Sequence, residues 1–383
     1  MSRSSRALVF HGPGLPLELR AFPTPDPEGC EILVEVVACT LCSSDLHTIQ
    51  GRRQEAVPTV LGHEMLGRIA AFGSAAARQD AAGQPLELGD RVTWAIVASC
   101  GQCFACARAL PQKCERRVKY GHEALAPRRD LTGGLAEHCL LAPGTAIFRV
   151  PDRLPDETAC PANCATATVA GAIEAAGELA ERSILVMGCG MLGVTATAWA
   201  GTLGCSSVIA CDLDSDRRTL ARSFGATHSV LPEELAECVS AATGGHGVDA
   251  AIELTGSAEA FEQIYPLVRL GGTIVLVGAT YPSRPVLLTM EQVVRRCLTL
   301  RGQHNYAPRH LQTAIAFHER HIELPFPSLV AAWQPLERVA EAVASGLGRG
   351  ALRLGVRPGI LGETPTDRTS LGSSGIARVG ISP

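Results

Sequence analysis

Residues 183–193 read SILVMGCGMLG, and this stretch decides the fold of the chain. Its first five residues are almost entirely apolar, as in a strand that is buried on both faces of a parallel sheet. The glycines at 188, 190 and 193 then form the pattern GxGxxG, and residues 194–203 suit a helix. Because the pattern stands between a strand and a helix, it predicts a turn that binds a dinucleotide, which a GxGxxG without such flanks does not.

Each position of this turn meets its own requirement. Gly188 makes the tight turn, Gly190 lets the backbone approach a pyrophosphate, and Gly193 lets the helix pack on the strand. The N-terminus of the helix attracts the anion. Met191 and Leu192 lie inside the turn, so we expect them to contact the dinucleotide as well. A glycine-rich turn that binds nothing is the alternative.

An acidic residue at the end of the next apolar run fits the same interpretation. Asp212 follows Gly193 by about 20 residues, the spacing at which a carboxylate accepts hydrogen bonds from the ribose hydroxyls. The 2′-phosphate of NADP would meet this negative charge, so the sequence favours NAD. A chance aspartate is the alternative.

Strand and helix patterns alternate through the second half of the chain. Such alternation implies crossover helices and a parallel sheet. The strands are expected at residues 183–187, 207–212, 227–231, 248–254, 272–278 and 298–301. Residues 183–211 carry no charge and are long enough to span a membrane, but their glycines and strand-like start favour a buried strand followed by a buried helix.

The rest of the chain has a different texture. Its first part reads as short strands separated by Gly and Pro, at residues 31–38, 68–72, 90–97 and 135–141. Helices are expected at residues 311–320 and 336–346, with a last strand at 351–356. Residues 361–383 are rich in Ser, Thr, Gly and Pro and lack periodicity, which predicts a disordered tail.

Length and composition bound the function. A chain of 383 residues, 46% of them hydrophobic, exceeds one typical core, so two domains are expected. The net charge of −4 leaves no basic surplus for nucleic acid, which is therefore not an expected partner. The cysteines number 15, an odd count, and no secretory leader is recognised. We therefore expect reduced thiols and metal ligands in a cytoplasmic protein.

Four of the cysteines form a compact motif, CxxCxxCx7C, at Cys100, Cys103, Cys106 and Cys114. Four thiolates on one short lobe can close a tetrahedron around zinc and leave no open position, which is the arrangement of a structural site. The metal would stabilise a lobe that has little core of its own. Four free cysteines in a loop are the alternative.

Other candidate metal ligands are scattered along the chain. Cys42 begins the run CSSDLH, His63 and Glu64 lie in GHE, and Cys164 lies in NCAT. Taken singly, a lone His or Cys is more often a buried packing residue. Their occurrence together with the two motifs above gives them weight.

The whole set resembles a known family. The CxSDxH pattern from Cys42 to His47, the GHE signature, the four-cysteine lobe, Cys164 and the GxGxxG turn occur in the order found in zinc-dependent medium-chain alcohol dehydrogenases. The resemblance covers residues 5–358. The branch of this family that is proposed to act in phosphonate catabolism is similar in three shorter stretches, LPQKCE at 110–115, KYGH at 119–122 and PANCATAT at 161–168.

The resemblance implies a division of the chain. A GroES-like, mostly β catalytic domain is expected over residues 1–165, with the structural zinc lobe at 98–116. A Rossmann domain, with a doubly wound parallel sheet, is expected over residues 166–303. Residues 304–360 would return to the catalytic domain before the tail at 361–383.

The resemblance also implies a catalytic zinc site. Cys42, His63 and Cys164 would hold the metal, with Glu64 as an intermittent fourth ligand, and water or the substrate oxygen would fill the open position. Three protein ligands and one exchangeable position are what a catalytic zinc requires. Asp45 would orient His63 by accepting a hydrogen bond from its ring.

Two further residues are implied in proton transfer. Ser44 would accept the alcohol proton and pass it towards His47 through the cofactor ribose. The family often has Gly two residues before the first zinc cysteine, where this chain has Thr40. That departure can alter the local turn but removes no ligand.

Cofactor contacts outside the glycine turn follow from the same resemblance. In the family a basic residue follows the ribose-binding acid, and Arg217 stands at the matching position. Arg353 matches an arginine that reaches the pyrophosphate. Either could instead be an ordinary surface arginine. The expected nicotinamide contacts are Thr168, Val277, Gly278 and Ala279.

The function implied is an NAD-dependent zinc alcohol dehydrogenase, which moves a hydride between an alcohol and an aldehyde or ketone. NAD and two zinc ions per chain would be its cofactors, and no membrane partner is expected. The alternatives are a catalytically silent dinucleotide-binding protein and a zinc-free reductase of the same superfamily. The family commonly pairs through the edge strand after Leu298, which implies a homodimer or homotetramer.

The narrower resemblance implies a phosphonate-bearing substrate. A phosphonate dianion cannot be buried without donors that compensate its charge. Arg52 and Arg53 stand between His47 and His63, two residues expected at the active site, so they are the first candidates. Adjacent arginines in a loop are otherwise solvated surface charge. The secondary candidates are Lys119, His122 and His304.

Overall fold

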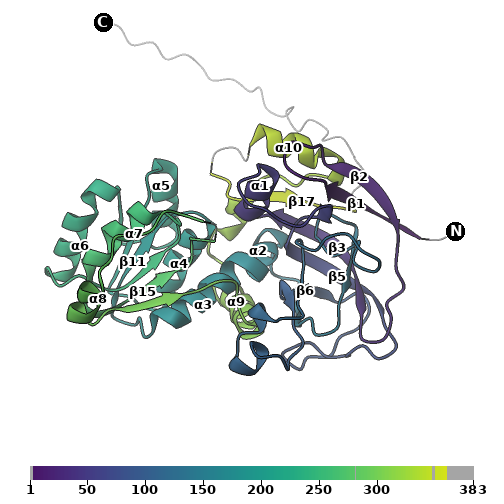
Figure 1. Cartoon of the computed structure of the whole chain (residues 1–383), viewed down its shortest axis with the longest axis horizontal. Helices are drawn as coiled ribbons and strands as arrows, with labels where there is room; N and C mark the ends of the chain where they lie inside the picture. Colours follow the sequence, from purple (N-terminus) through teal and green to yellow (C-terminus); the bar gives the residue numbers. More distant parts are fainter. Residues whose placement is uncertain (1–2, 281, 347–349, 360–383) are drawn as a thin grey trace, which may run out of the picture.

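The computed structural model describes residues 3–280, 282–346 and 350–359 and has two lobes (Figure 1). The teal and green middle of the chain forms one lobe. The purple N-terminal part forms the other, together with the yellow C-terminal segment. The predicted tail at 361–383 lies outside the described residues. Within the described ranges, no helix combines the length and the apolar composition needed to cross a bilayer.

The lobe formed by the middle of the chain is built on a six-stranded sheet in the order β13-β12-β11-β14-β15-β16. Every neighbouring pair in it is parallel. The strands are β11 (Ser183–Met187), β12 (Ser207–Cys211), β13 (His228–Val230), β14 (Val248–Glu253), β15 (Val268–Leu276) and β16 (Thr299–Gly302). The first strand lies inside the sheet and the chain winds outwards from it in both directions, so the predicted doubly wound Rossmann fold is confirmed.

Helices cover both faces of this sheet, which explains why its first strand is apolar on both sides. Ile184 and Val186 of β11 belong to one core, shared with α3 and α4. Leu185 and Met187 belong to the other, shared with α6 and α7. Successive side chains of a strand point to opposite faces, so a strand covered on both sides needs no polar face. The helices of this lobe are α3 (Ala167–Ala176), α4 (Met191–Thr202), α5 (Ser215–Ser223), α6 (Leu235–Thr243), α7 (Ala258–Ile264) and α8 (Met290–Arg296). The uncharged run at 183–211 is therefore β11, α4 and β12.

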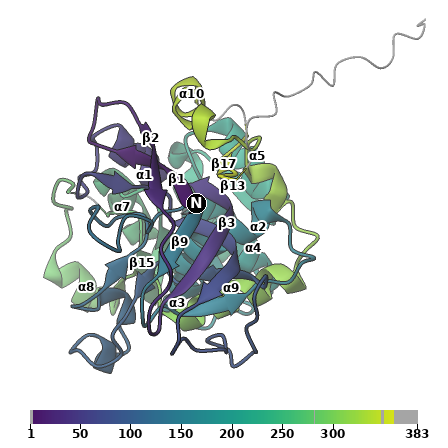
Figure 2. The ribbon, with the colours of Figure 1, turned by 90° about the vertical axis from the view of Figure 1, so that its right-hand side faces the viewer.

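The other lobe is mostly antiparallel β-structure, as predicted. Its larger sheet has the order β10-β6-β5-β3-β17, with β9 also paired to β3, and Figure 2 shows β3 and β9 from the side. These strands are β3 (Ile32–Leu41), β5 (Glu64–Phe72), β6 (Arg91–Trp94), β9 (His138–Leu141), β10 (Ile147–Arg149) and β17 (Leu354–Val356). Two smaller sheets contain β1 (Ser4–Phe10), β2 (Glu18–Pro23) and β4 (Thr59–Val60), and β7 (Val97–Ala98) with β8 (Val118–Lys119).

The register of β3 brings distant parts of the chain together. Thr40 pairs with Glu64 at the start of β5. Leu41 pairs with Leu354 of β17, which comes from the C-terminal segment. Arg353, the residue before β17, therefore lies beside the end of β3.

Short helices join the two lobes. α2 (Asp156–Pro161) leads through a π-helical turn, Ala162–Thr166, directly into α3. α9 (Pro308–Arg320) packs against α3 where the chain leaves the parallel sheet, and Figure 1 shows α2, α3 and α9 between the lobes. Cys164 lies in this π-helical turn, a local geometry that is frequent at functional sites.

Two predicted elements differ from the structure in more than the position of their ends. The strand expected at 90–97 is broken into β6 and β7, because the amide of Ile96 donates to the hydroxyl of Tyr306 (3.1 Å). The helix expected at 336–346 begins with a 3₁₀ turn before α10 (Val339–Ser345). Tyr306 lies far from residues 90–97 in the sequence, so the local pattern of apolar residues did not predict the break in the strand.

Candidate active site

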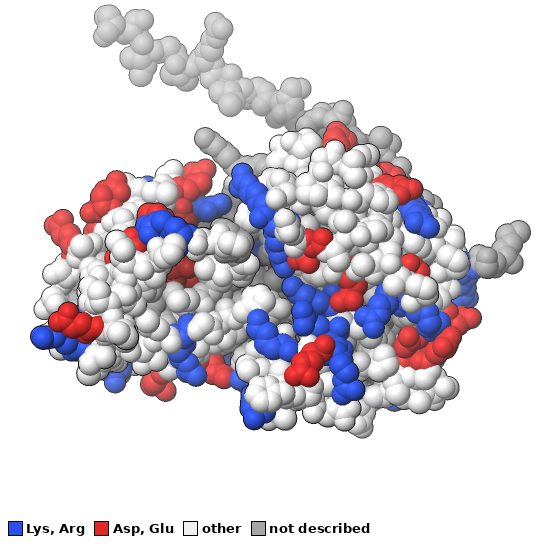
Figure 3. All heavy atoms as spheres, in the orientation of Figure 1, with Lys and Arg blue, Asp and Glu red and all other residues white. Residues whose placement is uncertain are grey.

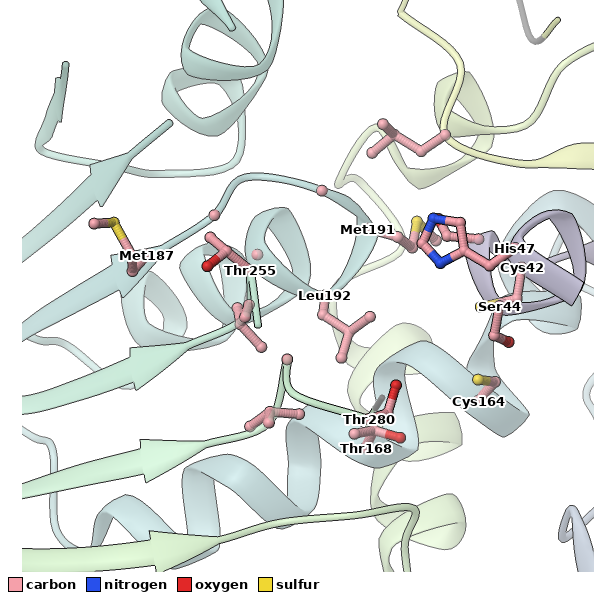
Figure 4. A pocket seen from close by; sticks show the side chains of 18 of the residues that line it. Cys42, Ser44, His47, Cys164, Thr168, Met187, Met191, Leu192, Thr255 and Thr280 are labelled. Carbon is pink, nitrogen blue, oxygen red and sulfur yellow. The ribbon is translucent and has the colours of Figure 1, made fainter. Parts of the chain in front are cut away.

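A cavity of about 780 Å³ lies between the two lobes, and both contribute to its walls. Cys42, His63 and Cys164 line it together with the glycine-rich turn. Figure 4 shows Cys42, Ser44 and His47 on one wall, with Met191 and Leu192 of the glycine turn across from them. The two motifs that the sequence analysis singled out therefore face one space.

Three separate segments supply the scattered metal ligands. Cys42 follows β3 and caps α1 (Ser43–Ile49), His63 immediately precedes β5, and Cys164 lies in the π-helical turn. Their donor atoms and those of Glu64 lie within 4.8 Å of one another. Cys164 Sγ is 3.4 Å from His63 Nε2, close to the edge of about 3.5 Å between sulfur and nitrogen ligands of tetrahedral zinc. The donor set fits a zinc ion.

Asp45 holds two of these ligands in place. Its Oδ2 accepts a hydrogen bond from the amide of Cys42 (2.9 Å). Its Oδ1 lies 3.2 Å from His63 Nδ1 and also accepts from the amide of Gly62 at 3.2 Å. With Nδ1 engaged by the carboxylate, Nε2 of His63 is the nitrogen left for a metal.

The chemistry of Cys42 also suits a metal ligand. A hydrogen bond from Cys164 lowers the pKa of the Cys42 thiol well below its usual value, and the charge of Arg353 acts in the same direction against the effect of burial. The thiolate, and not the thiol, is the form that binds metals.

Glu64 is held by two donors. Arg353 Nε lies 2.7 Å from Oε2 of Glu64, and both side chains of this ion pair are buried. Thr40 donates its hydroxyl to the same Oε2 at 2.6 Å. Arg353 Nη2 also lies 3.5 Å from Cys42 Sγ. A buried carboxylate needs such compensation, so these partners fix Glu64 beside the metal ligands.

Sequence reasoning missed this arrangement. Arg353 was expected at the pyrophosphate; it does line the cavity, but its partner in the structure is Glu64. Thr40 was noted only as a departure from the family's usual glycine. The sequence could have indicated this contact, because a threonine that pairs with a glutamate on the neighbouring strand can reach its carboxylate with the hydroxyl.

The four-cysteine lobe has the geometry of a closed metal site. The Sγ–Sγ separations are 3.5 Å for Cys103–Cys106, 3.9 Å for Cys103–Cys114 and 3.5 Å for Cys100–Cys114. Four sulfurs around tetrahedral zinc would be about 3.8 Å apart. A hydrogen bond from the backbone of Gln102 is the largest of the effects that lower the pKa of Cys100 to about 5. The thiols therefore fit zinc as a set, without a carboxylate or water.

The glycine turn meets its expected steric requirements. Gly188 has a φ of +97°, which side chains other than hydrogen rarely allow. A Cβ on Gly193 would lie 1.9 Å from the carbonyl oxygen of Gly188, so only glycine lets α4 pack this close. A Cβ on Gly190, the N-cap of α4, would meet nothing within 4 Å, which leaves room for a ligand at the helix N-terminus.

Asp212 lies beside this turn, at the carboxyl end of β12. Its Oδ2 accepts from the amide of Cys189 (2.7 Å), within the glycine motif, and its Oδ1 from the amide of Asp214 (2.9 Å). Arg217 Nη1 is 3.9 Å from Oδ2. Asp212 and Arg217 both line the cavity, so this end of it carries an anchored carboxylate with an arginine nearby.

The structure brings most of the remaining predicted residues to the cavity. Its lining includes Ser44, His47, Thr168, Val277, Gly278, Arg53, Lys119, His122 and His304. Arg52 and Ala279 are exposed and are not part of the lining. Lining residues that sequence reasoning did not name include Ile96, Thr280, Gln303 and Asn305. They come from three segments and belong to no motif, although Gln303 and Asn305 flank His304, which the sequence analysis named.

Comparison with known proteins finds a domain of a dehydrogenase family in each lobe. Residues 28–152 match the alcohol dehydrogenase GroES-like domain, and residues 192–320 match the zinc-binding dehydrogenase family. An alcohol dehydrogenase of Geobacillus stearothermophilus is 30% identical over 308 residues, covering 79% of this chain and 85% of that protein. An L-threonine 3-dehydrogenase of Pyrococcus horikoshii is 29% identical over 311 residues, covering 79% and 83%.

A solved structure agrees over nearly the whole length. The alcohol dehydrogenase of Thermotoga maritima has a TM-score of 0.87 at 26% identity, covering 93% of this chain and 100% of that one. Fold and site together define a two-domain, zinc-binding dehydrogenase. The chain belongs to the zinc-dependent medium-chain alcohol dehydrogenase family, as its motifs predicted.

Proposed function

We propose that the chain is an NAD-linked zinc alcohol dehydrogenase that interconverts an alcohol and an aldehyde or ketone by hydride transfer. One observation carries this proposal: the donors of Cys42, His63 and Cys164 line the same cavity as the dinucleotide turn. An alcohol and a nicotinamide held in one space can react without a further encounter, which is a large part of enzymatic rate enhancement.

Zinc would supply a Lewis acid for the alcohol oxygen, and the nicotinamide would accept the hydride. The protein's own part includes moving the proton. Ser44 and His47 both line the cavity and lie three positions apart on α1, so they share one helix face. Ser44 Oγ would accept the alcohol proton while it releases its own hydroxyl proton towards His47, which would pass a proton outwards.

The cofactor occupies the part of the cavity formed by the parallel sheet. The N-terminus of α4 would hold the pyrophosphate, and Met191 and Leu192, which line the cavity, would contact the dinucleotide. Thr168, Val277 and Gly278 form the wall for the nicotinamide.

NAD is the cofactor that Asp212 favours, because the charge of its carboxylate repels a 2′-phosphate. Asp212→Gly should lower the ratio of kcat/KM with NAD to kcat/KM with NADP at least ten-fold. A parent enzyme that already used NADP more efficiently than NAD would contradict this role for Asp212.

Metal analysis combined with an alcohol screen tests the proposed function. Two zinc ions per chain, together with NADH formation from at least one alcohol, are expected. One zinc ion per chain without activity on any alcohol or aldehyde would indicate a silent dinucleotide-binding protein. Absence of zinc, together with reduction of a quinone or enone, would indicate the zinc-free reductase. Alcohols with and without a phosphonate group belong in the screen, because the narrower resemblance favours a phosphonate-bearing substrate.

The oligomeric state proposed is a homodimer or a homotetramer formed through β16. This edge strand is exposed along its whole length. Leu287, Met290 and Val294, which precede it, are exposed apolar side chains. An unpaired strand edge with apolar neighbours invites pairing with a second copy. Light scattering during size-exclusion chromatography should show at least a dimer, and Leu300→Lys should weaken it.

We place the protein in the cytoplasm. All 15 cysteines of the chain lie within the described residues, and none of them is in a disulfide. Thiols at this density stay reduced only in a reducing compartment.

A further inference from the structure

We propose that Lys119 and Arg53 form a subsite that binds an anionic substituent of the substrate, next to the catalytic metal ligands. That the ligand is a substrate rests on the proposed function, whereas the binding of an anion at this subsite does not. The expected ligand is a short alcohol that carries an acid group such as a carboxylate or a phosphonate.

Lys119 supplies the first cation of the subsite. It ends β8, lines the cavity and is half-buried. Among the described residues, no hydrogen bond or ion pair is made by its ammonium group. Burial is the largest of the effects that lower its pKa to about 8, and the charge of Arg53 adds to it. Glu55 and Cys164 act on Lys119 in the opposite sense, but neither forms an ion pair with its ammonium group, so this position gains stability when an anion binds.

Arg53 supplies a second cation from the loop after α1. It lines the cavity, and its Nη2 lies 2.6 Å from Oε1 of Glu55. Glu55 Oε1 is also 3.1 Å from His122 Nδ1. Although burial opposes it, the contact with His122 and the charges of Arg53 and Lys119 lower the pKa of Glu55 to about 2. One carboxylate therefore faces two cations, and a positive charge remains uncompensated.

Two histidines, His122 and His304, line the cavity nearby and offer ring nitrogens. Burial lowers the pKa of both His122 and His304 to about 4, and the cations around them act in the same direction. His304 contacts Lys113 Nζ, which comes from the four-cysteine lobe. The surroundings of Lys119 thus hold further cations and N–H donors. Of the nearby acids, Glu55 is shared by Arg53 and His122, and Glu123 accepts from the amide of Lys119 (2.7 Å) and from Arg129 (3.1 Å).

The subsite adjoins the metal. The ring of His122 lies 5.1 Å, centroid to centroid, from that of the zinc ligand candidate His63. Lys119 is close enough to Cys164 for their charges to interact. A short molecule with an alcohol at one end and an acid group at the other could therefore reach both. Figure 3 shows Lys and Arg gathered where the two lobes meet.

The expected ligand class follows from this lining. Pockets for neutral alcohols are mainly apolar, because a desolvated charge there would weaken binding. Arginine can bind two oxygens of one acid group with its planar fork, and lysine adds a point charge. The combination suits a carboxylate or a phosphonate.

Three alcohols of similar length separate the possibilities on the zinc-loaded enzyme with NAD. They are 2-hydroxyethylphosphonate, 3-hydroxypropanoate and propan-1-ol. We expect kcat/KM at least ten-fold higher for one of the two acids than for propan-1-ol, and the better acid identifies the group. Lys119→Met and Arg53→Gln should each lower kcat/KM for that acid ten-fold or more, and for propan-1-ol no more than two-fold. Arg52→Gln is the matched control, because it removes the same charge from the same loop outside the cavity.

Binding measured without turnover tests the anion subsite separately from the proposed dehydrogenase function. Methylphosphonate and acetate are titrated calorimetrically into the enzyme with NAD, and we expect at least one to bind to the parent and to Lys119→Arg but ten-fold more weakly to Lys119→Met. Binding of the acid without oxidation of any alcohol would support the subsite and contradict the proposed function. Oxidation of propan-1-ol with no preference for either acid and no binding of either anion would overturn the subsite and leave the function standing. Equal losses in Lys119→Met and Arg52→Gln would also overturn it.

Discussion

The two candidate metal sites of this molecule are built in opposite ways. The four-cysteine site takes all its ligands from residues 100–114, and three of the four cysteines are partly exposed. The second site takes Cys42, His63 and Cys164 from three segments, each placed by a different part of the fold. Its Cys42 and His63 are buried, and Asp45 lies behind them.

The difference shows what each site depends on. A closed set of four thiolates close in sequence can form wherever the metal folds the loop around itself. A site with an open position must be held by the protein, because the metal alone does not complete it. We therefore expect damage to the first site to reduce stability and damage to the second to abolish chemistry.

The largest effect is expected from His63→Ala. Dehydrogenase activity should fall below detection and one zinc ion per chain should be lost, because the open site then keeps too few ligands. The fold should survive, since the carboxylate of Asp45 still accepts from the amides of Cys42 and Gly62. NADH absorbance and metal content measure both effects. Full activity in a well-folded variant would overturn the assignment.

Cys103→Ala should act mainly on stability. Loss of one of four thiolates releases the metal that stabilises the lobe. We expect the unfolding temperature to fall by several degrees, at about 2–4 °C for each kcal/mol lost in a domain of 150–250 residues. Thermal unfolding with metal analysis is the measurement. An unchanged unfolding temperature in a protein that has lost this zinc would show that the lobe does not need it.

Asp45→Asn should lower the zinc affinity of the catalytic site and leave that of the four-cysteine site unchanged. Residues that orient a metal ligand typically change metal affinity about 10–100-fold. We expect that loss at the catalytic site, measured by competition with a chelator, and no change at the four-cysteine site. Equal weakening of both zinc ions would mean that Asp45 acts on the whole fold.

The smallest effect is expected from Thr40→Val, which removes the hydroxyl that donates to Glu64. Arg353 remains, so the loss should be about 1 kcal/mol of unfolding free energy. Thr40→Ser keeps a hydroxyl and is the matched control. If the two variants were equally stable, the bond between Thr40 and Glu64 would contribute nothing measurable.

Much of the fold was readable from the sequence because the parallel sheet leaves a strong local signal. The strand predicted at residues 183–187 is β11 without a shift, and the one predicted at 207–212 ends one residue early. Strands buried on both faces are continuous apolar runs, so their limits are visible. The break at Ile96 was not visible, because it depends on the hydroxyl of Tyr306.

The residues of the candidate site likewise include some that the sequence predicted and some that it did not. The metal ligands and the glycine turn stand in motifs, and the structure brings them to one cavity. The partner of Arg353 was missed because β17 crosses back to β3 only in the folded chain. Arg52 and Arg53 are equivalent in sequence, yet only Arg53 lines the cavity.

By itself, the sequence determined the elements whose chemistry is local: the strand, turn and helix at residues 183–203, the four-cysteine lobe, and the residue types able to bind metal. Only the tertiary structure decided which charges share a space. It paired Glu64 with Arg353, and it left the ammonium group of Lys119 at the cavity with no ion pair to any residue that the structure describes. The physical reason is that local geometry follows from backbone sterics and spacing, whereas the partner of a buried charge depends on how distant strands pair.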